Sequence, residues 1–195
     1  VAVVFGLNQV QSRVQILERE SGKKLWSISA QKVQACRLCA DGRLLFVATP
    51  EGWTLWDTVA YKAQAQVRVA NNVAGVRDDG SLVVVCQGTS MKAYDGSGKL
   101  LDSAPGPPSA KYRSLQVTPG TAMVSLQGGP DFLVYDLPNR KTVVENEGAV
   151  TLHPDGRSLV YVNPLGSMLG LALDPRQQLT PPVQSGGKST APLAI

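Results

Sequence analysis

The pair Cys36 and Cys39 is the first candidate for chemistry, because Cys-x-x-Cys is the spacing of zinc and thiol-redox sites. The pair lies in "VQACRLCA", where apolar and polar residues alternate as in a β-strand. Residues three apart on a strand point to opposite faces, and no second Cys-x-x-Cys or histidine pair completes four ligands. We therefore expect buried structural cysteines and no metal site.

Two other stretches contain residue types found in catalytic sites. "SGGKST", Ser185 to Thr190, is similar to the end of a phosphate-binding loop, but Pro182 stands where that loop needs a glycine. A flexible tail is the favoured interpretation. His153, the single histidine, stands just before a turn, and the sequence offers no partner nucleophile or acid for general-base work. We expect no catalytic residue and no cofactor.

A recurring acid indicates how the chain is built. Asp57, Asp95, Asp136 and Asp174 each end a short strand within a repeated unit, and Leu17-Glu18 holds the same place in a degenerate first unit. The units share a turn whose positions, Asp41, Asp79, Pro119 and Asp155, are 38, 40 and 36 residues apart. A carboxylate at the end of a strand can accept backbone N–H groups of the following turn. We therefore assign the acids to construction of the repeat.

Each unit predicts four antiparallel strands. Asp-Gly or Pro-Gly turns join the first two strands, and the second strand is almost wholly apolar, as in "LVVVCQ". Such a run favours burial on both faces, between neighbouring layers. Four-stranded units at a period near 40 residues predict an all-β fold, a β-propeller of about five blades, with a β-sandwich as the less favoured alternative.

The expected blades are residues 1–30, 31–70, 71–110, 111–147 and 148–185, and the first of them lacks its first strand. Residues 186–195 form either a tail or a strand that closes the ring. Two alternatives stay open. The chain forms a closed five-bladed ring, or it is part of a larger propeller.

The stretch "DGRLLFVATPEGWTLWDTVAYKAQAQV", starting at Asp41, resembles the second half of a WD40 repeat, with its turn, core strand, glycine turn and Trp-Asp pair. Trp-Asp occurs once, Tyr-Asp twice and Gly-His nowhere, so the histidine–aspartate network of that family is not carried over. The resemblance implies a divergent WD40-like propeller, a non-enzymatic scaffold for protein–protein interaction in a multi-subunit complex. "SGKKLWSIS", Ser21 to Ser29, is similar to a docking stretch of quinoprotein-type propellers, which leaves an exported quinoprotein-like or ligand-binding propeller as an alternative.

Loops that join fourth to first strands, and second to third strands, share one face of a propeller. On that face we expect the partner-binding residues Trp53, Asn71, Asn72, Lys111, Tyr112, Arg113, Asp131 and Phe132. Aromatic and arginine side chains are typical interface anchors. The alternative is that Trp53 and Phe132 begin third strands and pack on a neighbouring blade. Lys111 and Arg113 also leave association with RNA or the ribosome open.

Composition bears on the kind of partner and on the cellular compartment. The net charge of +4 is scattered over 195 residues, without the basic run of a nucleic-acid arm. No window of about 18 apolar residues predicts a membrane span, and the first residues do not match a signal peptide. Three cysteines make no disulfide framework, which favours the cytoplasm or another reducing intracellular compartment.

Overall fold

Five antiparallel sheets follow one another along the chain in the computed structural model, which describes residues 2–6, 11–118, 122–152, 158–162 and 168–172. In these residues every helical segment is a single 3-10 turn, η1 (Ala40–Gly42) and η2 (Ser109–Lys111). The predicted all-β fold is confirmed.

Strands that are neighbours in the sequence are neighbours in each sheet. Sheet 1 contains β1 (Ala2–Gly6), β2 (Gln11–Leu17) and β3 (Lys24–Gln31). Sheet 2 contains β4 (Ala35–Cys39), β5 (Leu44–Thr49), β6 (Gly52–Asp57) and β7 (Lys62–Arg68). Sheet 3 contains β8 (Asn72–Val76), β9 (Leu82–Gln87), β10 (Ser90–Asp95) and β11 (Leu100–Pro105). Sheet 4 contains β12 (Ser114–Val117), β13 (Met123–Gly128), β14 (Asp131–Asp136) and β15 (Lys141–Glu147). Sheet 5 contains β16 (Ala149–Leu152), β17 (Ser158–Val162) and β18 (Met168–Ala172).

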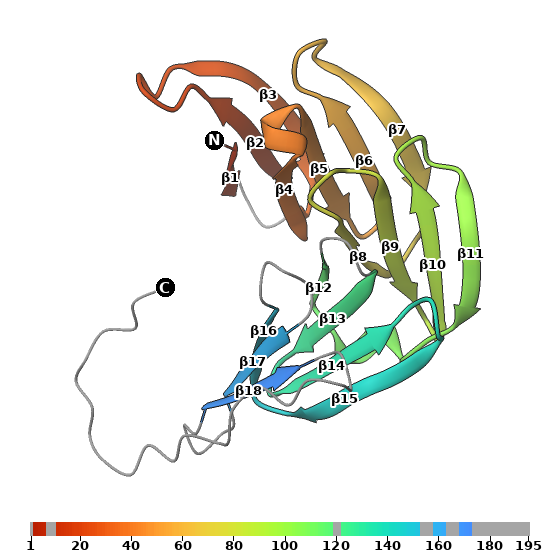
Figure 1. Cartoon of the computed structure of the whole chain (residues 1–195). Helices are drawn as coiled ribbons and strands as arrows, with labels where there is room; N and C mark the ends of the chain where they lie inside the picture. The colour runs from red at the N-terminus through yellow and green to blue at the C-terminus, as the bar shows by residue number, and fades with distance from the viewer. Residues whose placement is uncertain (1, 7–10, 119–121, 153–157, 163–167, 173–195) are drawn as a thin grey trace, which may run out of the picture.

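The sheets stand side by side along an arc, with β4, β8 and β12 on its inner side and β7, β11 and β15 on its outer side (Figure 1). The prediction of four-stranded antiparallel units is confirmed for sheets 2, 3 and 4. Sheets 1 and 5 lie on the two sides of an opening in this arc (Figure 1). Closure of the arc into a propeller, as a five-bladed ring or as part of a larger one, stays a prediction.

The cores lie between the sheets. In β9, Val83 and Val85 pack toward sheet 2, while Val84 and Cys86 pack toward sheet 4. Period-two alternation therefore buries both faces of one strand, as its apolar run predicts. Four such clusters join sheet 1 to 2, 2 to 3, 3 to 4 and 4 to 5 in the described part of the chain.

A β-bulge recurs at the same place in sheets 1 to 4. The pairing between the last two strands of each sheet shifts by one residue between Ile16 and Leu17, Leu55 and Trp56, Ala93 and Tyr94, and Val134 and Tyr135. In each of these sheets the extra residue is in the last strand, which strengthens the local twist of the outer edge.

The inner strands of sheets 3 and 4 approach closely at Gly75. A Cβ atom on Gly75 would lie 2.4 Å from the carbonyl oxygen of Leu115 in β12. Only a residue without a side chain fits this contact, so Gly75 sets how near the two inner strands can come.

We expect Gly75→Ala to destabilise the protein by about 1–3 kcal/mol, because the contact is with backbone and cannot relax by rotating a side chain. Thermal unfolding should show a Tm several degrees lower than that of the wild type. The neighbouring exposed change Ser114→Ala is the control and should leave Tm unchanged. An unaltered Tm for Gly75→Ala would contradict the close packing of β8 on β12.

Candidate partner-binding surface

Backbone hydrogen bonds bring two kinds of loop together on one face of sheets 2, 3 and 4. Beyond β7, the N–H of Asn71 donates to the carbonyl of Pro50 at 2.8 Å. In sheet 3, the N–H of Gly106 donates to the carbonyl of Thr89 at 2.8 Å. In sheet 4, the N–H of Gly148 donates to the carbonyl of Pro130 at 2.6 Å. The loop that leaves each fourth strand thus lies over the turn between second and third strands of the same sheet. We call this surface the loop face.

Trp53 and Phe132 are buried beneath the loop face. Trp53 is 1 % exposed, and its ring centroid lies 5.7 Å from that of Tyr94 in sheet 3. Phe132 is 0 % exposed, with its ring centroid 5.2 Å from that of Tyr161 in sheet 5. Both occupy the second position of a third strand, where alternation directs the side chain into the space between sheets. The structure therefore corrects their assignment as exposed anchors and favours the packing alternative.

Two further predicted anchors are also buried. Tyr112 belongs to the cluster between sheets 3 and 4. The side-chain amide of Asn72 donates to the carbonyls of Val69 and Thr49, and so fastens the exit loop of β7 to the neighbouring turn. These side chains hold the loops in place and do not meet solvent. The sequence-based assignment was wrong for these residues because they stand in polar loops. A polar loop does not reveal which of its side chains turns inward.

The remaining candidates stay accessible on the loop face. Asn71, Lys111 and Arg113 are exposed, and Asp131 is half-buried. Asn71 has a φ of 51°, in the left-handed region that asparagine tolerates better than most residues. Their role in binding stays a prediction.

The loop that carries Lys111 and Arg113 is held firmly. A Cβ atom on Gly128 would fall 1.7 Å from the carbonyl oxygen of Lys111, so only glycine allows the loop to lie this close to β13. Arg113 N–H donates to the carbonyl of Gln127 at 2.8 Å. The Gln127 amide donates in turn to the carbonyl of Gly148 at 3.1 Å, which ties this loop to the next one. Two cationic side chains therefore project from a rigid support.

The recurring acids serve the turns between third and fourth strands. Asp57 accepts the N–H groups of Val59 and Ala60, each at 2.8 Å. Asp95 accepts those of Ser97 and Lys99 at 2.9 and 3.0 Å. In sheet 4, Asp136 likewise accepts the N–H of Asn139 at 3.1 Å. The predicted constructional role is confirmed for these three acids, while Asp174 lies outside the described residues.

These hydrogen bonds favour the ionised carboxylates. The N–H of Ala60, followed by that of Val59, lowers the pKa of Asp57 below its ordinary value. The Ser97 hydroxyl and the Lys99 N–H lower the pKa of Asp95 in the same way.

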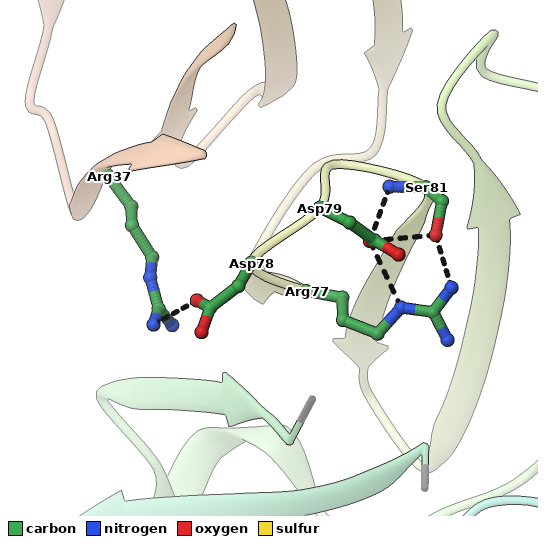
Figure 2. A network of polar contacts seen from close by, with 5 residues as sticks. All are labelled: Arg37, Arg77, Asp78, Asp79 and Ser81. Carbon is green, nitrogen blue, oxygen red and sulfur yellow. Dashed lines mark hydrogen bonds and ion pairs between the residues drawn. The ribbon is translucent and has the colours of Figure 1, made fainter. Parts of the chain in front are cut away.

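The turn between β8 and β9 contains a second polar network (Figure 2). Asp78 forms an ion pair with Arg37 of sheet 2, and its carbonyl accepts the N–H of Ala40 at 2.6 Å. The side chain of its neighbour Asp79 points the other way (Figure 2). Its carboxylate forms an ion pair with the guanidinium of Arg77 at 3.0 Å and accepts the N–H of Ser81 at 2.9 Å. One turn thus links sheet 3 to sheet 2 and stabilises its own hairpin.

The two cysteines of the Cys-x-x-Cys pair face opposite sides of β4. Cys36 packs with the cluster between sheets 1 and 2, and Cys39 with the cluster between sheets 2 and 3. Burial raises the pKa of each thiol to about 11, so both stay protonated near neutral pH. This geometry gives the pair no shared ligand site.

The other two sequence candidates, "SGGKST" and His153, lie outside the described residues. Within the described ranges, no three His, Cys, Asp or Glu side chains gather as they would around a metal ion. The same part of the chain contains no helix long and apolar enough to cross a membrane. No protein-family profile matches the sequence, and no curated protein shows significant similarity to it.

Asp79 should make the stability of the protein depend on pH. Burial disfavours its charge, but hydrogen bonds from Arg77 and Ser81 outweigh this effect and lower its pKa from 3.8 to about 2. The ionised carboxylate therefore stabilises the folded state above about pH 4, and this contribution is lost as the pH falls toward about 2.

We expect Asp79→Ala to lower Tm at pH 7, and we expect its difference from the wild type to shrink between pH 4 and pH 2. A series of thermal melts over this range measures the effect. Glu51→Gln removes an exposed acid of the loop face and is the control. A difference that stays constant down to pH 2 would show that the Asp79 carboxylate does not act through its charge.

Proposed function

We propose that the chain is a non-enzymatic, WD40-like propeller scaffold that holds a partner protein within a larger assembly. The observation that carries the proposal is the loop face, where Asn71, Lys111 and Arg113 are exposed on loops whose neighbouring side chains are buried. A surface that is ordered before binding loses little conformational entropy when a partner docks. Such a face suits recognition of another macromolecule.

The constructional use of the repeated acids supports this proposal. Each of the carboxylates of Asp57, Asp95 and Asp136 accepts hydrogen bonds from its own turn. The residues that recur most regularly are thereby accounted for by the fold. The residues that differ between units, such as Lys111 and Arg113, are then the ones that distinguish a partner.

Other features support an assembly partner, an intracellular location and the WD40-like type. The open arc of sheets supports membership in a larger propeller. Cys36, Cys39 and Cys86 are free thiols, which supports a reducing intracellular compartment. The Trp56-Asp57 pair at the end of β6 is the feature that suggests the WD40-like type.

RNA binding is the second candidate function. Lys111 and Arg113 are exposed two residues apart on one loop, and their charges can meet successive phosphates. This candidate differs from the first in its salt dependence. Binding dominated by phosphate contacts weakens steeply with salt, whereas a protein interface of mixed chemistry weakens much less.

Affinity capture with the tagged chain tests the proposal. We expect the double variant Lys111→Ala/Arg113→Ala to retain about a tenth or less of the bound partner, since charged anchors at an interface contribute strongly. The charge-matched control Lys99→Ala/Lys141→Ala alters two exposed lysines, one just before β11 and one at the start of β15, and should bind normally.

Capture that persists at high salt and after nuclease treatment indicates a protein partner. Capture that disappears in both treatments indicates RNA. Equal loss in the two double variants would contradict a specific role for the loop face.

A further inference from the structure

An aromatic cluster lies between sheets 1 and 2, on the outer part of the fold. The ring centroid of Trp26 lies 5.2 Å from that of Trp56 and 5.7 Å from that of Tyr61. Trp26 and Trp56 are half-buried, while Tyr61 is 48 % and the nearby Val59 is 71 % exposed. We call Trp26, Trp56, Val59 and Tyr61 the rim cluster.

The backbone of Tyr61 shows that its presence is not a requirement of the turn. Tyr61 has a φ of 53°, a left-handed conformation that is costly for a bulky side chain. It stands four residues after Asp57, and Gly22 stands four residues after Glu18 in the equivalent turn of sheet 1, with a φ of 66°. Arg140 holds the equivalent position in sheet 4 with a φ of 52°, so these turns accept residues other than glycine and do not require a tyrosine. Tyr61 contacts Trp26 and leaves 48 % of its surface exposed, and this exposed surface is available to a partner.

A groove runs from the rim cluster toward the loop face. It encloses about 290 Å³, and Trp56 is the member of the rim cluster that lines it. The other lining residues include Ile28 and Ala30 of β3, Gln66 and Arg68 of β7, and Glu51 at the end nearest the loop face. From Trp56 to Gly52 the third strand spans four residue steps, or about 14 Å at ~3.4 Å per residue. This length fits four or five residues of an extended peptide.

The charges around the rim cluster are mainly positive. Lys24 is close in sequence to Trp26, and Lys62 follows Tyr61; both lysines are exposed. Asp57 lies close to Lys62 and stays ionised, because the N–H groups of Val59 and Ala60 stabilise its charge. Positive charges still outnumber negative ones in these turns, with Arg19, Lys23, Lys24, Arg43 and Lys62 against Glu18, Glu20 and Asp57. An acidic segment therefore complements this end of the groove.

We propose that this groove binds an extended segment of a partner protein, with a large apolar side chain placed among Trp26, Trp56 and Tyr61. Acidic residues of the segment lie beside that anchor and face Lys24 and Lys62. The inference rests on the proposed scaffold function, and it adds a second contact surface that is separate from the loop face.

Selection of random nonapeptides displayed on phage, with the purified whole chain as bait, tests the inference. We expect the selected peptides to share an aromatic or leucine residue next to aspartate or glutamate. Synthetic versions should change the tryptophan fluorescence of the chain, since Trp26 and Trp56 lie at the site, and should give a saturable binding curve.

Two variants make the result specific. Tyr61→Asn should weaken binding of the selected peptides by about tenfold, while the turn is kept because asparagine tolerates a positive φ. Lys24→Glu/Lys62→Glu should weaken it further. Leu101→Asn is the matched control, since Leu101 is 56 % exposed on the outer strand of sheet 3, and it should leave binding and Tm unchanged.

Several outcomes would overturn the inference. These are selection without an acidic and apolar motif, or peptides that bind Tyr61→Asn as tightly as the wild type. Self-association in sedimentation experiments that Tyr61→Asn removes would make a second molecule of this chain the occupant. Deletion of residues 175–195 that raises peptide affinity would make the chain's own end the occupant.

The variants also separate this inference from the proposed function. If Lys111→Ala/Arg113→Ala abolishes capture but no peptide binds the groove, only the groove proposal fails. If peptides bind the groove and the loop-face variant captures its partner normally, the loop-face proposal fails instead.

Discussion

Each second strand must be covered on both faces, and the rest of the structure depends on this constraint. In β5, Leu45 faces sheet 1 and Phe46 faces sheet 3, and both side chains are almost wholly buried. Burial of one such side chain contributes about 1.5–3 kcal/mol, which is available only if the sheet that it faces is in place. The stability of every sheet is thus coupled to the sheets beside it, as in other repeat proteins.

Short-range interactions give each sheet its shape within that stack. The bulge before the third-strand acid adds a residue to the outer strand, and the acid then closes the following turn. The ion pair between Arg37 and Asp78 adds a polar link between sheets at one turn. These contacts are made by backbone groups and by a few side chains, within a unit or between two adjacent units. The side chains of Lys111, Arg113 and Tyr61 take no part in them.

The loop face and the rim groove differ in how their residues could be recognised from the sequence. Lys111 and Arg113 stand in a polar loop rich in turn residues, and exposure there was predictable. Trp53, Tyr112 and Phe132 stand close to such loops too, yet they face inward and pack between sheets. The rim cluster was not predicted, since Trp26 and Tyr61 come from different units. No local pattern marks Tyr61 either, because the equivalent turn position holds Gly22 in sheet 1 and Arg140 in sheet 4.

The sequence by itself determined the repeat, the antiparallel strands, the two-sided burial of second strands and the role of the acids. All of these follow from patterns within about 40 residues, where spacing and alternation translate directly into geometry. Only the tertiary structure decided which aromatic side chains are buried and which meet at the rim. That outcome depends on how twisted sheets pack against one another, which brings together residues 35 positions apart, such as Trp26 and Tyr61, without any local pattern to mark them.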